Sequence, residues 1–189
     1  MIRLPVVALL TLGCPAAAVA AGNLVLNPGF DADLNDWTPV TSAGASVSRD
    51  ASFGNPAGSV YASAPLPNTS AAITQCIGIS APFIADFSVD GYASAASVSG
   101  GWVLAATAYD AVGCAGNDLG VLPQVDYSFP PSSWHGFTVI FAGALPAGTQ
   151  SVLLTVGCEA LAAAGSSDNY YFDNVWFGDD RLFADGFGS

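Results

Sequence analysis

Short hydrophobic runs, separated by turn-forming residues, recur along most of the chain. β-Branched and aromatic residues gather in the runs, while Gly, Ala, Ser, Pro and Asp dominate the connections. No segment carries a sustained helical period with capping residues at its ends. Many short strands at fairly even spacing predict an all-β fold, an antiparallel β-sandwich or jelly roll of two stacked sheets. The expected strands are Asn23–Leu26, Ala45–Arg49, Ser59–Ala62, Ala72–Ile79, Ile84–Ala93, Gly101–Tyr109, His135–Phe141, Ser151–Gly157 and Tyr170–Phe177.

The segment Phe83–Tyr92 alternates between apolar and polar positions, as a half-buried antiparallel strand does. Trp102–Tyr109 and Val152–Val156 are instead nearly continuous apolar runs, which predict central strands covered on both sides. Alternating strands beside buried runs are what two stacked sheets require. In Phe83–Tyr92 the expected core face carries Phe83, Ala85, Phe87, Val89 and Gly91, and the other face carries Ile84, Asp86, Ser88, Asp90 and Tyr92.

The 189 residues suit one domain with a single core. Residues 1–20 have the pattern of a secretory signal peptide: Arg3, the apolar run Leu4–Leu12, and small residues ending in Ala18-Val19-Ala20. The apolar run is too short to span a bilayer as a helix. A lipoprotein anchor at Cys14 is the weaker alternative. We therefore expect export, a β-jelly-roll domain over residues 21–178, and a C-terminal tail over 179–189.

The chain beyond residue 20 is strongly acidic. It contains no lysine, and its two arginines, Arg49 and Arg181, stand against 15 acidic residues, which gives a formal net charge of −13. Nucleic-acid backbones and anionic membrane surfaces need Lys and Arg, so both are disfavoured as partners. A neutral glycan or a cation remains compatible with this charge, and the acidity also favours solubility.

Three cysteines lie beyond residue 20: Cys76, Cys114 and Cys158. In an oxidising compartment two of them are expected to pair, and the third would be left free or would bond to another chain. The residues alone do not decide which two pair. The absence of a C-x-x-C motif and the single histidine disfavour a zinc site.

The two ends of the domain carry the most specific sequence signals. Asn23–Trp37 reads NLVLNPGFDADLNDW, a short apolar strand, an Asn-Pro-Gly turn and a run of carboxylates. Tyr170–Phe177 reads YYFDNVWF, the clearest strand in the chain. Together these segments resemble the opening N-L-x-x-N-G-x-F-E…G-W and the ending F-D-D-V-x-L of the jelly-roll carbohydrate-binding modules of the galactose-binding-like superfamily, the type found with cellulases and xylanases.

The resemblance implies a disulfide pairing. In the topology of that superfamily, the strand holding Cys76 lies in the same sheet as the strand ending at Tyr109, and both run in one direction. The loop Asp110–Gly116 would then return past the first of these strands. This path would bring Cys114 to Cys76.

The resemblance also implies a structural calcium where the first turn meets the last strand. The matching positions are Asp31, which replaces the usual Glu, and Asp173, with backbone carbonyls completing the shell. Calcium takes 6–8 oxygen ligands in flexible geometry, so this set is chemically sufficient. In the alternative, Asp31 is a turn carboxylate and Asp173 a strand-end acid. Asp31, Asp33 and Asp36 do not match a helix–loop–helix calcium motif.

Neutral sugars stack their C–H faces on aromatic rings and bind amide or carboxylate side chains through their hydroxyls. Strand alternation groups Phe172, Asn174 and Trp176 on one face of the last strand. Trp176 beside Asn174, and Tyr92 beside Asp90, are therefore the expected ligand-binding residues. Core packing is the alternative for every aromatic, and we expect Trp37 and Trp134 in the core or at its rim and leave Trp102 open.

Catalysis has little support in the sequence. His135 is the sole histidine, and no G-x-S-x-G motif accompanies it. Acidic residues without a positioned partner are usually a solvated face. We therefore expect a secreted, non-catalytic module for a neutral polysaccharide or oligosaccharide, with a structural calcium. An exported protein-interaction sandwich with a protein partner is the first alternative, and a stand-alone glycan hydrolase is the second.

Overall fold

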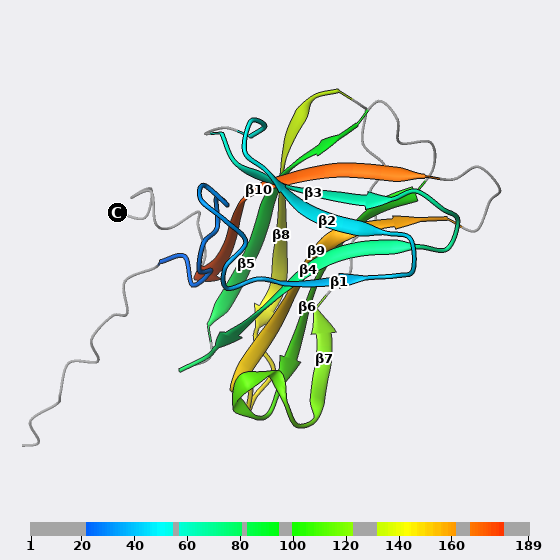
Figure 1. Cartoon of the computed structure of the whole chain (residues 1–189). Coiled ribbons are helices and arrows are strands. Elements are labelled where there is room, and N and C mark those ends of the chain that lie inside the picture. Colours follow the sequence, from blue (N-terminus) through cyan, green and yellow to red (C-terminus); the bar gives the residue numbers. More distant parts are fainter. Residues whose placement is uncertain are drawn as a thin grey trace, which may run out of the picture.

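The chain folds into two antiparallel five-stranded sheets stacked on each other (Figure 1). This computed structural model describes residues 22–54, 57–80, 83–94, 100–122, 132–161 and 167–179. One sheet has the strand order β2-β3-β10-β5-β8 and is called the β10 sheet after its middle strand; the other, the β9 sheet, has the order β1-β4-β9-β6-β7. The all-β sandwich prediction is confirmed. The expected signal peptide, and the tail beyond residue 179, lie outside the described residues.

Every pairing within the two sheets is antiparallel. The strands of the β10 sheet are β2 (Ser46–Asp50), β3 (Ser59–Ala64), β5 (Ile84–Ala93), β8 (Trp134–Ala144) and β10 (Asp168–Asp179). Those of the β9 sheet are β1 (Thr38–Thr41), β4 (Ser70–Gly78), β6 (Gly100–Tyr109), β7 (Asp118–Leu122) and β9 (Ser151–Ala160). A short 3-10 turn, η1 (Val112–Cys114), lies between β6 and β7. Within the described segments no helix has the length and hydrophobicity needed to cross a membrane.

The core lies between the sheets and centres on Trp102 of β6, which is 1% exposed. Its ring lies over Gly91 of β5, where an added Cβ would come within 2.3 Å of the ring. Glycine at this strand position therefore allows the close approach of the two sheets. Phe172 of β10 meets the same ring edge-on, with the ring centroids 5.6 Å apart. Trp102 is thus a core residue, which settles the open alternative, and so is Trp37.

In β5 the expected core residues Ala85, Phe87 and Val89 face the core. The prediction that β5 is only half-buried is wrong, because Asp86 and Ser88 on its other face are buried as well, at 1% and 3% exposure. The prediction that β6 is covered on both sides is wrong. Its alternate residues, such as Val103 and Ala105, are half-buried rather than buried. No second sheet packs on the outer face of a sandwich sheet, so apolar side chains on that face can stay partly exposed.

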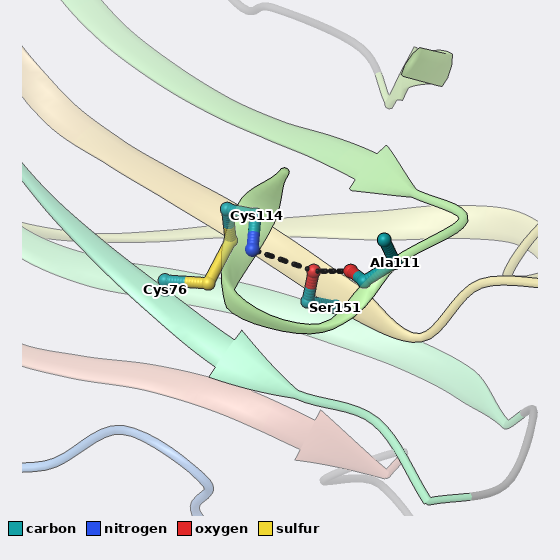
Figure 2. The surroundings of a disulfide bond; sticks show 4 residues. All are labelled: Cys76, Ala111, Cys114 and Ser151. Atoms are coloured by element: carbon teal, nitrogen blue, oxygen red, sulfur yellow. Dashed lines mark hydrogen bonds between the residues drawn. A yellow bond between two sulfur atoms is a disulfide. The ribbon is translucent and has the colours of Figure 1, made fainter. Parts of the chain in front are cut away.

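The disulfide joins Cys76 on β4 to Cys114 in η1, with the Cα atoms 5.9 Å apart (Figure 2). β4 and β6 both pair antiparallel with β9, so they run in one direction with β9 between them. The loop after β6 then returns across the end of β9. Its path is fixed by Ser151, whose hydroxyl accepts the backbone N–H of Cys114 at 2.9 Å and donates to the carbonyl of Ala111 at 2.6 Å. The implied pairing is confirmed.

The third cysteine, Cys158 on β9, is buried and 0% exposed. Burial raises the pKa of its thiol to about 12, with a smaller contribution from the nearby Asp168 carboxylate. A bond from Cys158 to another chain would require this part of the core to open. The alternative of a cysteine-linked partner is therefore not supported by the fold.

The expected strand Asn23–Leu26 is instead an extended segment with one isolated bridge, between Asn23 and Gly178. Side chains supply the other backbone partners. Asn23 Oδ1 accepts the N–H groups of Val25 and Phe177, at 3.1 and 3.0 Å. Gln75 of β4 binds both the N–H and the carbonyl of Leu26, each at 2.8 Å. The segment is therefore attached to both sheets, and it belongs fully to neither.

Candidate functional site

A β-bulge in the last strand changes which of its side chains face the core. The register of β10 against β5 shifts between Asp173 and Trp176, and Asn174 in this interval has a positive φ of 50°. Asn tolerates this left-handed conformation better than most residues. Phe172 consequently lies in the core at 0% exposure, together with Val175 and Phe177. The prediction that Phe172 shares a face with Asn174 and Trp176 is wrong.

The four predicted ligand-binding residues lie on the β10 sheet, around the β5–β10 pair. The amide of Asn174 donates to Asp90 Oδ2 at 3.0 Å, so these two side chains do come together. Trp176, which is half-buried, pairs with Ser88, and Tyr92 lies at the end of β5 away from that pair. Trp176 and Tyr92 are therefore separated by four positions of β5, about 13 Å along the strand.

Tyr92 belongs to a row of aromatic residues that runs across four neighbouring strands. Tyr171 of β10 pairs directly with Tyr61 of β3 and with Tyr92 of β5, and Tyr92 pairs in turn with Trp134 of β8. The ring centroids are 4.9, 6.0 and 5.7 Å apart along the row. We call Tyr61, Tyr171, Tyr92 and Trp134 the aromatic row. All four are half-buried on the face of the sheet opposite the core.

A fifth ring, Phe53 in the connection between β2 and β3, packs on this row. Its centroid lies 4.3 Å from that of Tyr171, 4.9 Å from that of Tyr92 and 5.5 Å from that of Trp134. The contact with Trp134 is stacked, with an angle of 29° between the ring planes. Phe53 therefore covers part of the ring surface in the middle of the row.

Polar groups surround the aromatic row. Asn169 Oδ1 accepts the hydroxyls of Tyr61 and Ser63, at 2.8 and 2.7 Å. Burial raises the pKa of Tyr171, and the negative charge of Asp50 raises it further. Hydrogen bonds from the backbone and the hydroxyl of Ser52 lower the pKa of Asp50, so this carboxylate is ionised at neutral pH. The row thus combines ring faces, neutral hydroxyls and negative charge.

The comparisons with known proteins bear on the fold. No family model matches the sequence, and no curated protein is similar to it. Among solved structures, the tailspike protein 4 enzymatically active domain of bacteriophage CBA120 aligns with a TM-score of 0.59 and 17% identity, over 82% of this chain and 21% of that one. The CBM22-1 xylan-binding domain of Paenibacillus barcinonensis Xyn10C aligns with a TM-score of 0.57 and 16% identity, over 86% and 97%.

A third structure is the module TmCBM61 in complex with β-1,4-galactotriose, with a TM-score of 0.55 and 15% identity over 84% of this chain and 99% of that one. Most of the similar structures are carbohydrate-binding modules of the β-sandwich type. The chain has the fold of the jelly-roll carbohydrate-binding modules. At these identities the likeness shows the fold, and the ligand has to be argued from the residues of this chain.

The first turn and the last strand of this module-like fold meet where the resemblance implied a calcium ion. The N–H of Val175 donates to the carbonyl of Pro28 at 2.9 Å. Asp31 is exposed, whereas Asp173 is 1% exposed and accepts the N–H of Asn174 at 2.8 Å. Within the described ranges no group of three or more His, Cys, Asp or Glu residues is placed to hold a metal. The calcium site stays a prediction.

The sole histidine lies at the start of β8, next to the aromatic row. Its Nε2 is 2.7 Å from the hydroxyl of Ser133, which is exposed and two residues earlier in the chain. Serine and histidine are two members of a hydrolytic triad, but the triad also requires an orienting acid and donors for an oxyanion. This pair alone does not constitute a catalytic site.

Proposed function

We propose that this protein is an exported, non-catalytic module that binds a neutral polysaccharide or oligosaccharide at the aromatic row. The observation that carries the proposal is the direct pairing of four aromatic residues across four strands, on a sheet face that is not used by the core. The fold shared with carbohydrate-binding modules supports it. Export is supported by the disulfide, which is typical of proteins outside the reducing cytosol.

The shape of the row favours a linear glycan that crosses the strands. Neighbouring strands lie about 4.8 Å apart, so the row places one ring per strand over roughly 15 Å. That length corresponds to a few sugar units. At the β3 end of the row, the hydroxyls of Tyr61 and Ser63 and the side chain of Asn169 offer hydrogen bonds. The Asn174–Asp90 pair lies beside the row, since Asp90 is two residues before Tyr92 on β5.

The charge around the row favours a neutral ligand. Asp50 and Asp90 lie near the row, and the chain beyond residue 20 carries 15 acidic residues against two arginines. A glycan with carboxylate or sulfate groups would be repelled. We therefore place neutral xylans, β-glucans and galactans before uronic-acid polymers as ligands.

The test is native affinity electrophoresis of the protein through gels that contain one of these soluble neutral glycans. We expect one glycan to retard the protein, and Tyr92→Ala and Tyr171→Ala to weaken binding by about tenfold each, since one aromatic contact contributes about 0.5–1.5 kcal/mol beyond its buried area. Tyr109→Ala, on β6 of the other sheet, is the matched control and should leave retardation unchanged. Circular dichroism checks that each variant is folded.

Three results would contradict the proposal. Retardation that is lost in Trp176→Ala but kept in Tyr92→Ala would move the binding site to the Trp176 half of the sheet. No retardation on any neutral glycan would favour the protein-interaction alternative. Release of reducing sugar from the glycan that binds would replace the non-catalytic assignment with a hydrolase.

The position of Phe53 gives a separate prediction for the same site. Because Phe53 lies on Tyr171, Tyr92 and Trp134, it covers ring surface on which a sugar would stack. We expect Phe53→Ala to increase the retardation and to make Trp134 more accessible to acrylamide quenching. Increased quenching together with weaker retardation would instead identify Phe53 as one of the rings that hold the sugar.

A further inference from the structure

The first turn of the domain directs two backbone carbonyls at a single cationic side chain. Phe30 is fully buried and has a positive φ of 50°, a conformation that non-glycine residues rarely adopt. The carbonyl of Phe30 accepts Nε of Arg49 at 2.6 Å, and the carbonyl of Asp31 accepts Nη2 of the same guanidinium. Arg49 lies on β2, so these bonds connect the turn to the edge of the β10 sheet.

The space around the guanidinium is closed by a glycine. Gly58, with a φ of 131°, precedes β3, and an added Cβ there would lie 2.9 Å from the carbonyl oxygen of Phe30, 3.0 Å from Cα of Asp31 and 3.3 Å from Nη2 of Arg49. Any side chain at position 58 would push against the turn or the guanidinium. The site is therefore shaped around the planar head of an arginine.

This use of Arg49 is notable because cations are scarce in the chain. Arg49 is the sole Lys or Arg among the described residues, in a protein with 15 acidic residues. Two of its five N–H donors nevertheless go to neutral carbonyl oxygens, although its charge also lowers the pKa of the neighbouring Asp50. Backbone carbonyls that converge on a cation are also the neutral part of a calcium shell.

A calcium ion does not fit well beside this guanidinium. The ion needs 6–8 oxygen ligands, and two carbonyls of the turn already accept hydrogen bonds from Arg49. Asp173 Oδ1 likewise accepts the N–H of Asn174. A divalent ion held by Asp31 would in addition lie next to a fixed positive charge that repels it. The two cations are alternatives at this turn.

We propose that the guanidinium of Arg49 is the structural cation of the first turn, and that it replaces the calcium ion that the resemblance implies. Arginine is charged at every accessible pH and presents donors in a rigid fork, so it can hold two carbonyls at once without a metal. The domain then keeps its N-terminal turn in calcium-poor surroundings. This proposal is independent of the proposed glycan binding.

The test is thermal unfolding of the full chain in a chelator and in millimolar calcium, together with calorimetric titration of calcium into the folded protein. We expect the Tm of the wild type to be the same in both solutions and the titration to show no binding. A Tm that rises with calcium, or a stoichiometric binding isotherm, would overturn the proposal. This measurement needs no variant.

Two substitutions test the role of the side chain itself. Arg49→Met keeps the length of the stem but removes the charge and the donors, and we expect the Tm to fall by about 5–10 °C, because two hydrogen bonds to a charged group are lost. Arg49→Lys keeps the charge but lacks the forked pair of donors, so we expect its Tm to lie between those of the wild type and Arg49→Met. Arg181→Met, which removes one arginine outside the described residues, is the control for net charge. An Arg49→Met variant as stable as this control would also contradict the proposal.

Discussion

Asp168 is a buried carboxylic acid whose ionisation is disfavoured by the fold. It begins β10, is 1% exposed, and lies so close to Gly100 that an added Cβ there would be 1.6 Å from its Oδ2. Burial raises the pKa of this carboxyl group to about 7, and the nearby backbone of Gly101 offsets only part of the rise. The same carboxylate contributes to the raised pKa values of Cys158 and Tyr170. Its charge is therefore unfavourable in the folded state.

The raised pKa of Asp168 predicts a pH dependence of stability. Between about pH 4 and pH 7 the folded protein retains a proton that the unfolded chain releases, so stability falls as pH rises through this window, by at most about 4 kcal/mol in total. We expect Asp168→Asn to gain stability relative to the wild type between pH 5 and pH 8. Urea unfolding of both proteins at the two pH values measures this. If the variant and the wild type differed in stability by the same amount at pH 5 and pH 8, Asp168 would be excluded as the cause of the pH dependence.

At the scale of elements, the disulfide holds the β6–β7 connection to β4. The bond closes a loop with a sequence separation of 38 residues, for which the chain-entropy model gives about 3–4 kcal/mol of stabilisation. We expect the double variant Cys76→Ser/Cys114→Ser to lose about that much free energy of unfolding. Denaturant unfolding with and without a reductant measures the loss. The wild type should respond to the reductant and the variant should not, and a response in both would implicate some other group.

How well the sequence predicted each strand follows from how that strand is buried. β5 was predicted with its observed bounds, because Ala85, Phe87 and Val89 alternate with polar residues in the sequence, although Asp86 and Ser88 are buried too. β1 (Thr38–Thr41) and β7 (Asp118–Leu122) were missed, because both are edge strands without a buried face that would impose a hydrophobic pattern. The disulfide was predicted through the topology of the resembling superfamily, since the residues alone left the pairing open.

The candidate site was less predictable than the fold. Tyr92 was found through alternation in β5, but its neighbours in the row come from β3, β8 and β10, which are far apart in the sequence. Only the register between strands shows that they are adjacent. The bulge at Asn174 had a similar effect, because a single inserted residue reverses the face of every side chain on one side of it. No periodicity argument reveals where such an insertion lies.

For the whole molecule, the net charge and the topology both favour the binding of a neutral partner on one outer face. A formal net charge of −12 for the full sequence, with a single arginine among the described residues, leaves the surface suited to neutral partners. The sandwich separates its two outer faces, and the aromatic row occupies only the one on the β10 sheet. The proposed binding and the hydrogen bonds of Arg49 to the first turn use different residues of the same sheet, although Arg49 lies next to Asp50, whose charge acts on Tyr171. The calcium measurements on the wild type test the Arg49 proposal without changing the row.

The bridge between Asn23 and Gly178 brings the two ends of the domain together, with the N–H of Leu24 donating to the carbonyl of Phe177 at 2.8 Å. Tyr171 lies seven residues before Gly178 on β10, which at about 3.3 Å per residue places the aromatic row roughly 20 Å from that bridge. Any polypeptide joined at either end would thus depart from one shared point. The aromatic row would then lie at the opposite end of β10 from the point of attachment.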